Sequence, residues 1–331
     1  MCGIAGFSSY EEDYGICRGK WEEILETMNQ VQKRRGPDED GIFLDAHCGM
    51  AHVRLCILDL KRGQQPMSRH SQGRTCTICF NGEIYNMKAL RKELEAEGAI
   101  FQSDSDTEVF LVGYMLHGEN FVKRINGVFG AALWDSDKET LFLFRDRAGV
   151  KPLFYTKYRE TLVYASELKG ILAYPGMEAV ADADTLCEIF ALGPAKTYGK
   201  GVLKDIYEVL PGHYLVFHKG KIRDICYWKL ESHVQEASFE ETVEKTSWLI
   251  EDAVKLQMLS DVPVSTFLSG GVDSSLVTAI CAKELKKQGK TLRTFSFDFE
   301  GNRKYFKANR FQPSQDRPWV EKMVKFCQSE H

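Results

Sequence analysis

The chain begins Met1-Cys-Gly-Ile-Ala-Gly-Phe7. Cys2 directly follows the initiator methionine, and its side chain is small enough for that methionine to be removed. Removal would leave a thiol and a free α-amine on one residue, and an amine with a pKa of about 7.7–8.0 can act as the base for its own side chain. A cysteine at position 2 alone is a weak signal, since most such cysteines are inert. The motifs that follow decide whether this one is a nucleophile.

Five further motifs follow in order: Arg35-Gly-Pro-Asp38, Ala51-His-Val-Arg-Leu-Cys-Ile-Leu-Asp59, Asn81-Gly-Glu-Ile-Tyr-Asn86, Ser105-Asp-Thr-Glu108 and Arg145-Asp-Arg-Ala-Gly-Val-Lys-Pro-Leu-Phe154. Together with the start of the chain, this series resembles the glutamine amidotransferases of the N-terminal nucleophile hydrolase fold, from Cys2 to about Trp228. The resemblance implies a glutaminase in which Cys2 attacks the side-chain amide of glutamine, giving a thioester and ammonia. Arg34 departs from the family, which usually has histidine there, and this leaves the conformation of the loop near Cys2 open.

The resemblance also implies which residues bind glutamine. Arg54 matches the arginine that holds the α-carboxylate, and a planar guanidinium fits a carboxylate better than lysine would. Glu83 and Asp106 match the two acids that hold the α-ammonium. Asn81 and Gly82 match the oxyanion hole, where a side-chain amide and a backbone N–H face the charge that develops on the attacked carbonyl.

Some residues near these motifs allow simpler interpretations. Asn81-Gly82 alone favours a hairpin turn after a strand expected at residues 75–80, and turn and oxyanion hole could share the same atoms. His52 is expected to be a hydrogen-bonded core histidine rather than a base, because the nucleophile already carries one. Cys76 and Cys79 do not indicate a metal site, since residues three apart in a strand point to opposite faces and no second pair lies nearby.

A second motif, Ser269-Gly-Gly-Val-Asp-Ser-Ser275, lies between a strand expected at residues 264–268 and a helix expected at residues 274–287. The glycines let the backbone turn tightly and expose N–H groups, the serines add hydroxyl donors, and the helix start adds partial positive charge. Together these features favour an anion-binding loop, with Asp273 available to hold Mg2+ beside phosphates. The alternative is a plain glycine turn.

Because it follows an apolar strand, the pattern Ser-Gly-Gly-x-Asp-Ser resembles the pyrophosphate loop of the ATP pyrophosphatases. The resemblance implies ATP and Mg2+ as cofactors, with tentative Mg2+ binding at Asp273. The implied ATP-binding residues are Leu268, Ser269, Gly270, Gly271, Asp273, Ser274 and Phe297. Of these, Leu268 and Phe297 match positions whose backbone contacts adenosine, and Phe297 is expected on a strand at residues 292–299.

Both motif sets together resemble the glutamine-hydrolysing asparagine synthetases, and this resemblance extends over Phe311-Gln-Pro-Ser-Gln-Asp-Arg-Pro-Trp-Val320. In that family ATP activates aspartate as an aspartyl-adenylate, and ammonia from glutamine displaces AMP after travelling through an interior tunnel. Glutamine, aspartate and ATP are thus the implied ligands, and dimers are common in the family. Two alternatives stay open: a related synthetase with another acceptor, such as one that closes a lactam, and a subunit that binds glutamine without turnover.

The pattern of elements predicts two domains, residues 1–228 and residues 229–331. In the first, apolar runs alternate with glycine-rich turns, which predicts strands near residues 41–44, 48–52, 75–80, 130–134, 140–145, 161–166 and 213–218 and helices near residues 21–31, 87–97 and 106–116. This predicts a layered α+β domain, and the resemblance implies a four-layer αββα sandwich.

After a polar linker at residues 231–238, a helix at residues 239–259 and a strand–helix–strand unit predict the start of an α/β parallel-sheet domain of the ATP-pyrophosphatase type. One such unit gives a sheet too small to bury itself, so we expect the chain to be a fragment of a longer protein.

The composition excludes several classes of protein. The 331 residues include 43 Lys plus Arg and 47 Asp plus Glu, and the formal net charge of −4 gives no bulk electrostatic reason to bind nucleic acid or an anionic membrane. No apolar run approaches the roughly 18 residues of a membrane span. The N-terminus lacks the pattern of a secretory signal, and the ten scattered cysteines suit reduced thiols. A cytoplasmic protein is therefore expected.

Overall fold

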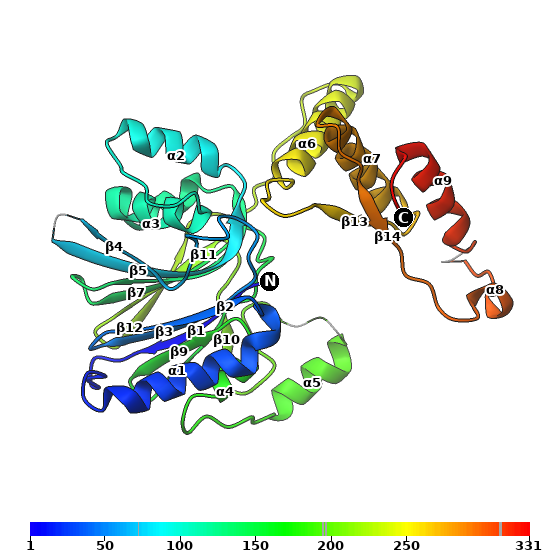
Figure 1. The fold of residues 1–331 in the computed structure, drawn as a ribbon. Coiled ribbons are helices and arrows are strands. Elements are labelled where there is room, and N and C mark those ends of the chain that lie inside the picture. Colours follow the sequence, from blue (N-terminus) through cyan, green and yellow to red (C-terminus); the bar gives the residue numbers. More distant parts are fainter. Residues whose placement is uncertain (72, 194, 196, 311–312) are drawn as a thin grey trace. The chain divides into compact units, whose positions relative to one another are not determined.

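The computed structural model describes residues 1–71, 73–193, 195, 197–310 and 313–331 (Figure 1). The chain divides into two compact units, Met1–Ser232 and His233–His331. Each unit has its own architecture and is described by itself.

Two six-stranded sheets form the centre of the first unit. Sheet A has the strand order β10-β8-β9-β1-β3-β2, with β1 Gly3–Ser8, β2 Glu39–Leu44, β3 Cys48–Arg54, β8 Phe154–Tyr158, β9 Thr161–Ala165 and β10 Tyr207–Glu208. Sheet B has the order β12-β11-β7-β6-β5-β4, with β4 Met67–Ser71, β5 Arg74–Ile84, β6 Gly127–Asp135, β7 Thr140–Arg145, β11 His213–His218 and β12 Lys221–Cys226. The strand pairs in both sheets are antiparallel.

Helices cover the outer face of each sheet (Figure 1). The helices α1 (Arg18–Gln32) and α4 (Leu168–Leu172) lie against sheet A, while α2 (Met87–Ala96) and α3 (Asp106–His117) lie on the side of sheet B. On α1 the buried residues include Trp21, Ile24, Leu25 and Met28, which recur at the helical spacing seen in the sequence. The predicted four-layer αββα sandwich is confirmed.

Side-chain alternation in β3 divides its residues between two cores. Cys48 and Met50 pack between the two sheets, whereas Ala51 packs under α1. Because alternate residues of a strand share a face, His52 and Arg54 continue the face that looks toward sheet B. The space between the sheets therefore changes from an apolar core to a polar site near the end of β3.

Several strands escaped prediction, namely β1, β4, β8, β10 and β12. The strand β1 consists largely of small residues that are all buried, so it has no polar alternation to reveal it. The strand β12 lies at an edge of sheet B and is mostly exposed. The expected strands are all present, and β7 and β11 have the predicted bounds.

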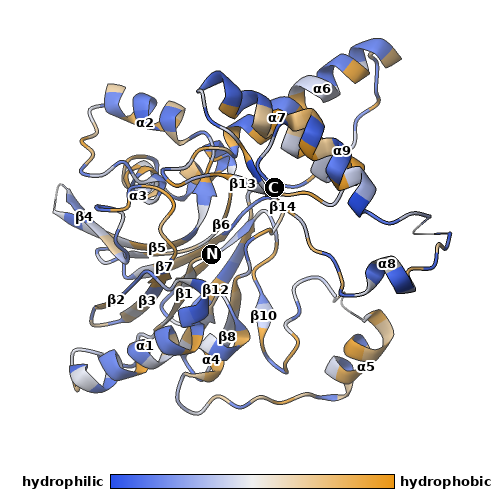
Figure 2. Cartoon of the chain, turned by 45° about the vertical axis from the view of Figure 1, so that its right-hand side comes forward, coloured by the Kyte–Doolittle hydropathy of each residue, from blue (hydrophilic) through white to orange (hydrophobic). Residues whose placement is uncertain are grey.

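Three further elements belong to the first unit, namely two short 3-10 helices at Lys33–Arg35 and Gly118–Arg124 and the helix α5 (Ala183–Leu192). Figure 2 shows that α5 is largely hydrophobic, although Phe190 on this helix is 85% exposed. In the described part of the chain, no helix combines the length and apolar character that crossing a bilayer requires.

The second unit contains a small parallel sheet. Its elements are α6 Phe239–Leu256, β13 Ser265–Phe267, α7 Val272–Lys287, β14 Arg293–Phe295, α8 Asn302–Tyr305 and α9 Arg317–Cys327. The strands β13 and β14 pair in parallel, which confirms the strand–helix–strand unit. The strand expected at residues 292–299 is too long, because β14 ends at Phe295. The helix expected from Ser274 starts earlier, at Val272, so Asp273 lies in its first turn.

Candidate active site

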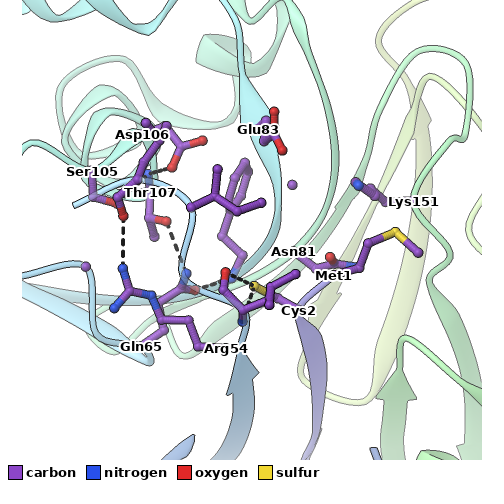
Figure 3. Close-up of a pocket in the computed structure, with 16 residues that line it drawn as sticks. Met1, Cys2, Arg54, Gln65, Asn81, Glu83, Ser105, Asp106, Thr107 and Lys151 are labelled. Carbon is purple, nitrogen blue, oxygen red and sulfur yellow. Dashed lines mark hydrogen bonds between the residues drawn. The ribbon is translucent and has the colours of Figure 1, made fainter. Parts of the chain in front are cut away.

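One pocket of the first unit brings together all six residues that the sequence predicts for glutamine (Figure 3). It is lined by Cys2, Arg54, Asn81, Gly82, Glu83 and Asp106, together with Met1, Gln65, Ser105, Thr107, Lys151 and several apolar residues. These residues come from the start of β1, the end of β3, the second half of β5 and the first turn of α3.

Cys2 lies directly before β1, an interior strand of sheet A that is paired on both sides. Its Sγ donates to the carbonyl oxygen of Leu55 at 3.7 Å and accepts the N–H of the same residue at 3.4 Å. Its own carbonyl oxygen accepts Nε of Arg35 at 2.8 Å, and Arg35 also pairs with Glu167 at 3.0 Å. Burial raises the pKa of the Cys2 thiol, so forming the thiolate requires a base.

Met1 occupies the position next to the thiol and lines the same pocket. Burial lowers the pKa of its α-amine. While Met1 is present, the nitrogen of Cys2 is part of a peptide bond and cannot act as a base. Arg34, the position that departs from the resembled family, is exposed in the short helix Lys33–Arg35.

The guanidinium of Arg54 is fixed before any ligand arrives. It is 4% exposed, pairs with Glu39 at 2.7 Å and donates to the carbonyl oxygens of Leu58 and Asp59 at 3.0 and 2.8 Å. A Cβ on Gly63 would overlap Nη2 of Arg54, so glycine makes room for this arrangement. A guanidinium has five N–H donors, so these contacts hold the group and still leave donors for a carboxylate.

Asn81 and Gly82 lie inside β5, opposite Gly130 and Phe129 of β6. The hairpin-turn interpretation is therefore wrong, because β5 continues past both residues. The side chain of Asn81 is 1% exposed, and its Nδ2 has no hydrogen-bond partner among the described residues. A buried donor without a partner costs about 1–3 kcal/mol, which a ligand acceptor in the pocket would recover.

Glycine is required at position 82. A Cβ there would overlap the carbonyl oxygen of Val128 and lie 2.5 Å from Cβ of Phe129. The close approach of β6 thus leaves room for backbone only.

Two carboxylates form another wall of the pocket. Asp106 begins α3, where Ser105 is the N-cap and accepts the N–H of Thr107 at 3.1 Å. Burial raises the pKa of Asp106 to about 6, although it accepts the N–H groups of Ile84 and Thr107 at 3.0 and 2.8 Å. Burial also raises the pKa of Glu83. Two desolvated acids on one wall of the pocket form a site that favours an ammonium group.

His52 is buried on the face of β3 that looks toward sheet B. Its Nε2 lies 3.2 Å from the carbonyl oxygen of Phe80, so this nitrogen carries the proton and donates. Burial lowers the pKa of His52 to about 4, which keeps the ring neutral. Its Nδ1 has no partner within the described residues, so the expected core histidine is satisfied at one nitrogen only.

Gln65 and Lys151 are pocket residues that the sequence reasoning missed. Lys151 lies within the motif from Arg145 to Phe154, so that motif could have indicated a residue of the pocket. Gln65 lies between Gly63 and the cis peptide bond that precedes Pro66, and no pattern in the sequence pointed to it.

The glycine-rich loop of the second unit joins β13 to α7. Oγ of Ser269 lies 2.9 Å from Oγ of Ser274 and accepts the N–H of Gly271 at 3.4 Å. Gly270 has φ +81, and a Cβ on it would lie 2.7 Å from Cβ of Trp319. Gly271 is the N-cap of α7 and offers no side-chain cap, so the first N–H groups of that helix stay available to a ligand.

A pocket beside this loop contains four of the predicted ATP residues, Leu268, Ser269, Ser274 and Phe297. Gly270, Gly271 and Asp273 are not among its lining residues. Phe297 follows β14 instead of lying on it, and its side chain is 80% exposed. Phe311 and Gln312, the first residues of the motif at residues 311–320, lie outside the described residues.

Asp273 is an exposed carboxylate in the first turn of α7. Among the described residues, no group of three or more His, Cys, Asp or Glu could hold a metal ion by itself. Mg2+ commonly binds through one or two carboxylates together with substrate phosphates, so one carboxylate beside this glycine-rich loop fits such an ion.

Comparison with known proteins identifies the family. Residues 1–228 match the family model for the glutamine amidotransferase domain, and residues 245–331 match the model for asparagine synthase. The chain therefore belongs to the glutamine amidotransferases. Within them it combines an amidotransferase domain with an asparagine synthase segment.

Curated relatives agree with this assignment. The chain is 44% identical over its full length to glutamine-hydrolyzing asparagine synthetase 3 of Bacillus subtilis and covers 53% of that protein. It is 33% identical to glutamine-hydrolyzing asparagine synthetase B of Escherichia coli, over 86% of this chain and 45% of that one. Amidase chyE of Penicillium rubens is 35% identical over 92% of this chain and 46% of its own length. The chain thus spans about half the length of these relatives.

A solved structure supports the fold. The glutamine phosphoribosylpyrophosphate amidotransferase from B. subtilis matches with a TM-score of 0.50 and 16% identity, covering 94% of this chain and 69% of that chain. At this identity the likeness concerns the fold alone.

Proposed function

We propose that this chain hydrolyses glutamine with Cys2 as the nucleophile. The observation that carries the proposal is a single pocket in which a thiol meets a fixed guanidinium, two carboxylates and an unpaired amide donor. Arg54 suits the α-carboxylate of glutamine, and Glu83 and Asp106 suit its α-ammonium. Held at both charged groups, the substrate would present its side-chain amide to Cys2.

The proposed reaction begins with removal of Met1. The freed α-amine of Cys2 takes the thiol proton, and the thiolate attacks the amide carbon. Asn81 Nδ2 and the N–H of Gly82 stabilise the resulting oxyanion, and losing one such donor costs roughly 2.7–4 kcal/mol in other enzymes. The C–N bond then breaks, ammonia leaves with the proton that the amine returns, and water hydrolyses the thioester to glutamate.

The test is glutamate release from glutamine by the purified chain beside Cys2→Ala, with the N-terminal residue determined by intact mass. We expect the activity to disappear in the variant while the fold is retained, because one sulfur atom is lost. Substantial turnover by a folded Cys2→Ala variant would refute the proposal, as would inactivity of a chain whose Cys2 is free.

For the whole protein, we propose ATP-dependent amidation of aspartate to asparagine with glutamine as the amide donor. The support is the asparagine synthase match and the relatives named asparagine synthetase. Ser269, Gly270, Gly271 and Ser274 would hold the phosphates, with Mg2+ at Asp273, and Leu268 and Phe297 would lie beside adenosine. ATP would supply adenylation of the aspartate carboxylate, with AMP and pyrophosphate as products.

A second candidate keeps both sites but changes the acceptor. It is favoured by the likeness to a protein named amidase chyE. Pyrophosphate release by the full-length protein, measured with ATP, glutamine and a panel of carboxylates, separates the two candidates. Release that depends on aspartate supports asparagine synthesis, and release that requires another carboxylate supports the second candidate.

We also propose a domain boundary between residues 228 and 229, assembly as a homodimer and a cytoplasmic location. The boundary is supported by the extent of the amidotransferase match, which ends at residue 228. Light scattering on the full-length protein tests the dimer.

A further inference from the structure

The strand that carries the oxyanion donors has an open edge beside the pocket. Pairing with β4 ends at Met67 opposite Ile78, whereas β5 continues to Ile84 and, among the described strands, pairs there with β6 alone. Backbone groups of alternate residues in a strand point to the same edge. Phe80, Gly82 and Ile84 therefore direct their N–H groups toward the open edge and away from β6.

Side chains take the place of the missing strand along this edge. Gln65 Oε1 accepts the N–H of Phe80 at 2.6 Å, and His52 Nε2 donates to the carbonyl oxygen of Phe80 at 3.2 Å. Four residues further along the same edge, Asp106 accepts the N–H of Ile84 at 3.0 Å. The N–H of Gly82 lies between these two fixed points.

Gln65 makes a second link across the pocket. Its Nε2 donates to Oγ1 of Thr107 at 3.2 Å, and Thr107 is adjacent to Asp106 at the start of α3. One side chain thus joins the strand that carries Asn81 to the helix that carries the proposed ammonium ligand.

We propose that Gln65, assisted by His52, is a positioning residue for glutamine hydrolysis. Both act through Phe80, whose peptide groups they hold and which directly precedes Asn81. This inference rests on the proposed glutaminase function. The oxyanion exists only after attack on the amide, so loosening its donors should lower kcat much more than it raises KM.

The first test replaces Gln65 by methionine, which is close in length and cannot hold the Phe80 N–H. In the full chain we expect kcat for glutamate release to fall about 10- to 100-fold, the scale of a misplaced catalytic group. Gln64→Met is the matched control, because Gln64 is exposed, is not a lining residue of the pocket, and donates its Nε2 to the carbonyl oxygen of Lys61 at 2.6 Å. An unchanged kcat in Gln65→Met would overturn the proposal.

Alkylation separates positioning from general damage to the site. With iodoacetamide, the Cys2 sulfur forms a bond to carbon as iodide leaves, and no oxyanion develops. We expect Cys2 in Gln65→Met to be alkylated at the wild-type rate. Mass spectrometry of the Cys2 peptide measures this rate. A loss of alkylation rate as large as the loss of kcat would refute a specific effect on the oxyanion donors.

A pair of variants tests the assistance from His52. His52→Gln can supply an N–H donor to Phe80 and should keep most of kcat, whereas His52→Leu should lose about as much as Gln65→Met. Equal kcat in both His52 variants would remove His52 from the proposal. An inactive wild type, or an active Cys2→Ala variant, would refute the glutaminase function itself; an active wild type with an unimpaired Gln65→Met variant refutes only this inference.

Discussion

The charged form of Asp106 is disfavoured because the carboxylate is buried. Burial raises its pKa to about 6, so the acid is protonated over part of the pH range in which most carboxylates are charged. Bound glutamine would reverse this balance, because an ammonium group beside the acid favours the charged form.

A pH dependence of glutamine binding follows. Below a pH of about 6 the unliganded Asp106 gains a proton, so the affinity for glutamine should fall as the pH drops through this value. Cys2→Ala allows the measurement by calorimetry without turnover. In the double variant Cys2→Ala with Asp106→Asn, binding should be weaker at neutral pH and should lack this pH dependence. Binding by Cys2→Ala that is constant from pH 5 to 8 would contradict the assignment of Asp106.

The same shift has an effect of opposite sign on stability. A carboxyl whose pKa is higher in the folded chain than in the unfolded chain binds more protons when folded, so its contribution to the unfolding free energy increases as the pH falls from about 6 toward its usual range. The acid therefore favours binding at neutral pH at the expense of stability.

Gly82 provides a second prediction at this scale. In Gly82→Ala the new methyl group overlaps the carbonyl oxygen of Val128, so β5 must move where the proposed oxyanion donor lies. We expect kcat for glutamate release to fall at least about 100-fold, as when an oxyanion donor is lost. Steady-state kinetics checks this, with Gly19→Ala as a control on helix α1, where a Cβ meets nothing within 4 Å and the backbone is helical. Activity near that of the wild type would contradict this prediction, because it would show that β6 can move away from the new methyl group without disturbing the site.

Individual site residues were easier to predict than their surroundings. The motifs named Cys2, Arg54 and Asp106, because residues that must meet a ligand come from short recognisable patterns. The pair Asn81-Gly82 was ambiguous, because Asn-Gly within a strand that lines a pocket cannot be told from the Asn-Gly of a hairpin turn by sequence alone. Gln65 could not be predicted from its neighbours in sequence. Its contact with Phe80 exists because pairing of β4 with β5 ends before Phe80.

At the scale of elements, β1 is packed too closely to accept a larger residue at Gly6. Gly6 faces Tyr164 and the backbone of Gly49, and a Cβ on it would overlap the Tyr164 hydroxyl and the Gly49 carbonyl oxygen. The strand lies between β9 and β3, so it cannot move aside without disturbing both neighbours.

Substitution of two glycines by alanine tests this rigidity. Gly6→Ala should lower the unfolding free energy by about 1–3 kcal/mol, as overpacking of a core does. Gly19→Ala on α1 meets nothing within 4 Å and should be neutral or stabilise by up to about 1 kcal/mol. Urea unfolding of the two variants measures both values. If Gly6→Ala were as stable as Gly19→Ala, the close packing around β1 would be incorrect.

Strand β1 also explains the limits of prediction for elements. Helix α1 has a buried face with clear periodicity, and strand β7 contains a run of large apolar residues between Thr140 and Arg145, so the sequence predicts both well. Strand β1 is buried on both faces and largely made of small residues, so hydrophobic alternation cannot reveal it. The shorter β14 differs for another reason, because it pairs with only three residues of β13 and, on its other side, forms a single bridge from Arg293 to Glu330.

On the scale of the whole molecule, the two units differ in how well they bury their apolar residues. The first contains two apolar cores on either side of sheet A. In the second, no residue of α6 is buried, and Phe267 and Phe295 on its two strands are 84% and 53% exposed. An isolated two-stranded sheet is marginal at best in water.

Separate expression of the units should reflect this difference. We expect residues 1–232 to unfold cooperatively and to release glutamate at close to the rate of the full chain. Residues 233–331 alone should bind a hydrophobic dye and lack a cooperative transition. Calorimetry and dye fluorescence test this expectation. A loss of glutaminase activity in residues 1–232 would mean that the site depends on the second unit.

The two proposed sites should also be separable by mutation. Asp273→Ala in the full-length protein should impair ATP-dependent amidation and leave glutamate release intact, because Asp273 belongs to the second unit. Asp273→Glu keeps a carboxylate and should recover part of the amidation. Equal loss of both activities in Asp273→Ala would contradict two separable sites.

The position of Met1 within the pocket has a practical consequence. Strand β1 is held on both sides, so whatever precedes Cys2 cannot swing out of the way by fraying that strand. A purification tag fused ahead of Cys2 would enter the proposed glutamine pocket and convert the α-amine into an amide. The protein would then be well folded but inactive as a glutaminase. Fusions for biochemistry should therefore be attached at the other end, or be cut by a protease that leaves cysteine as the first residue.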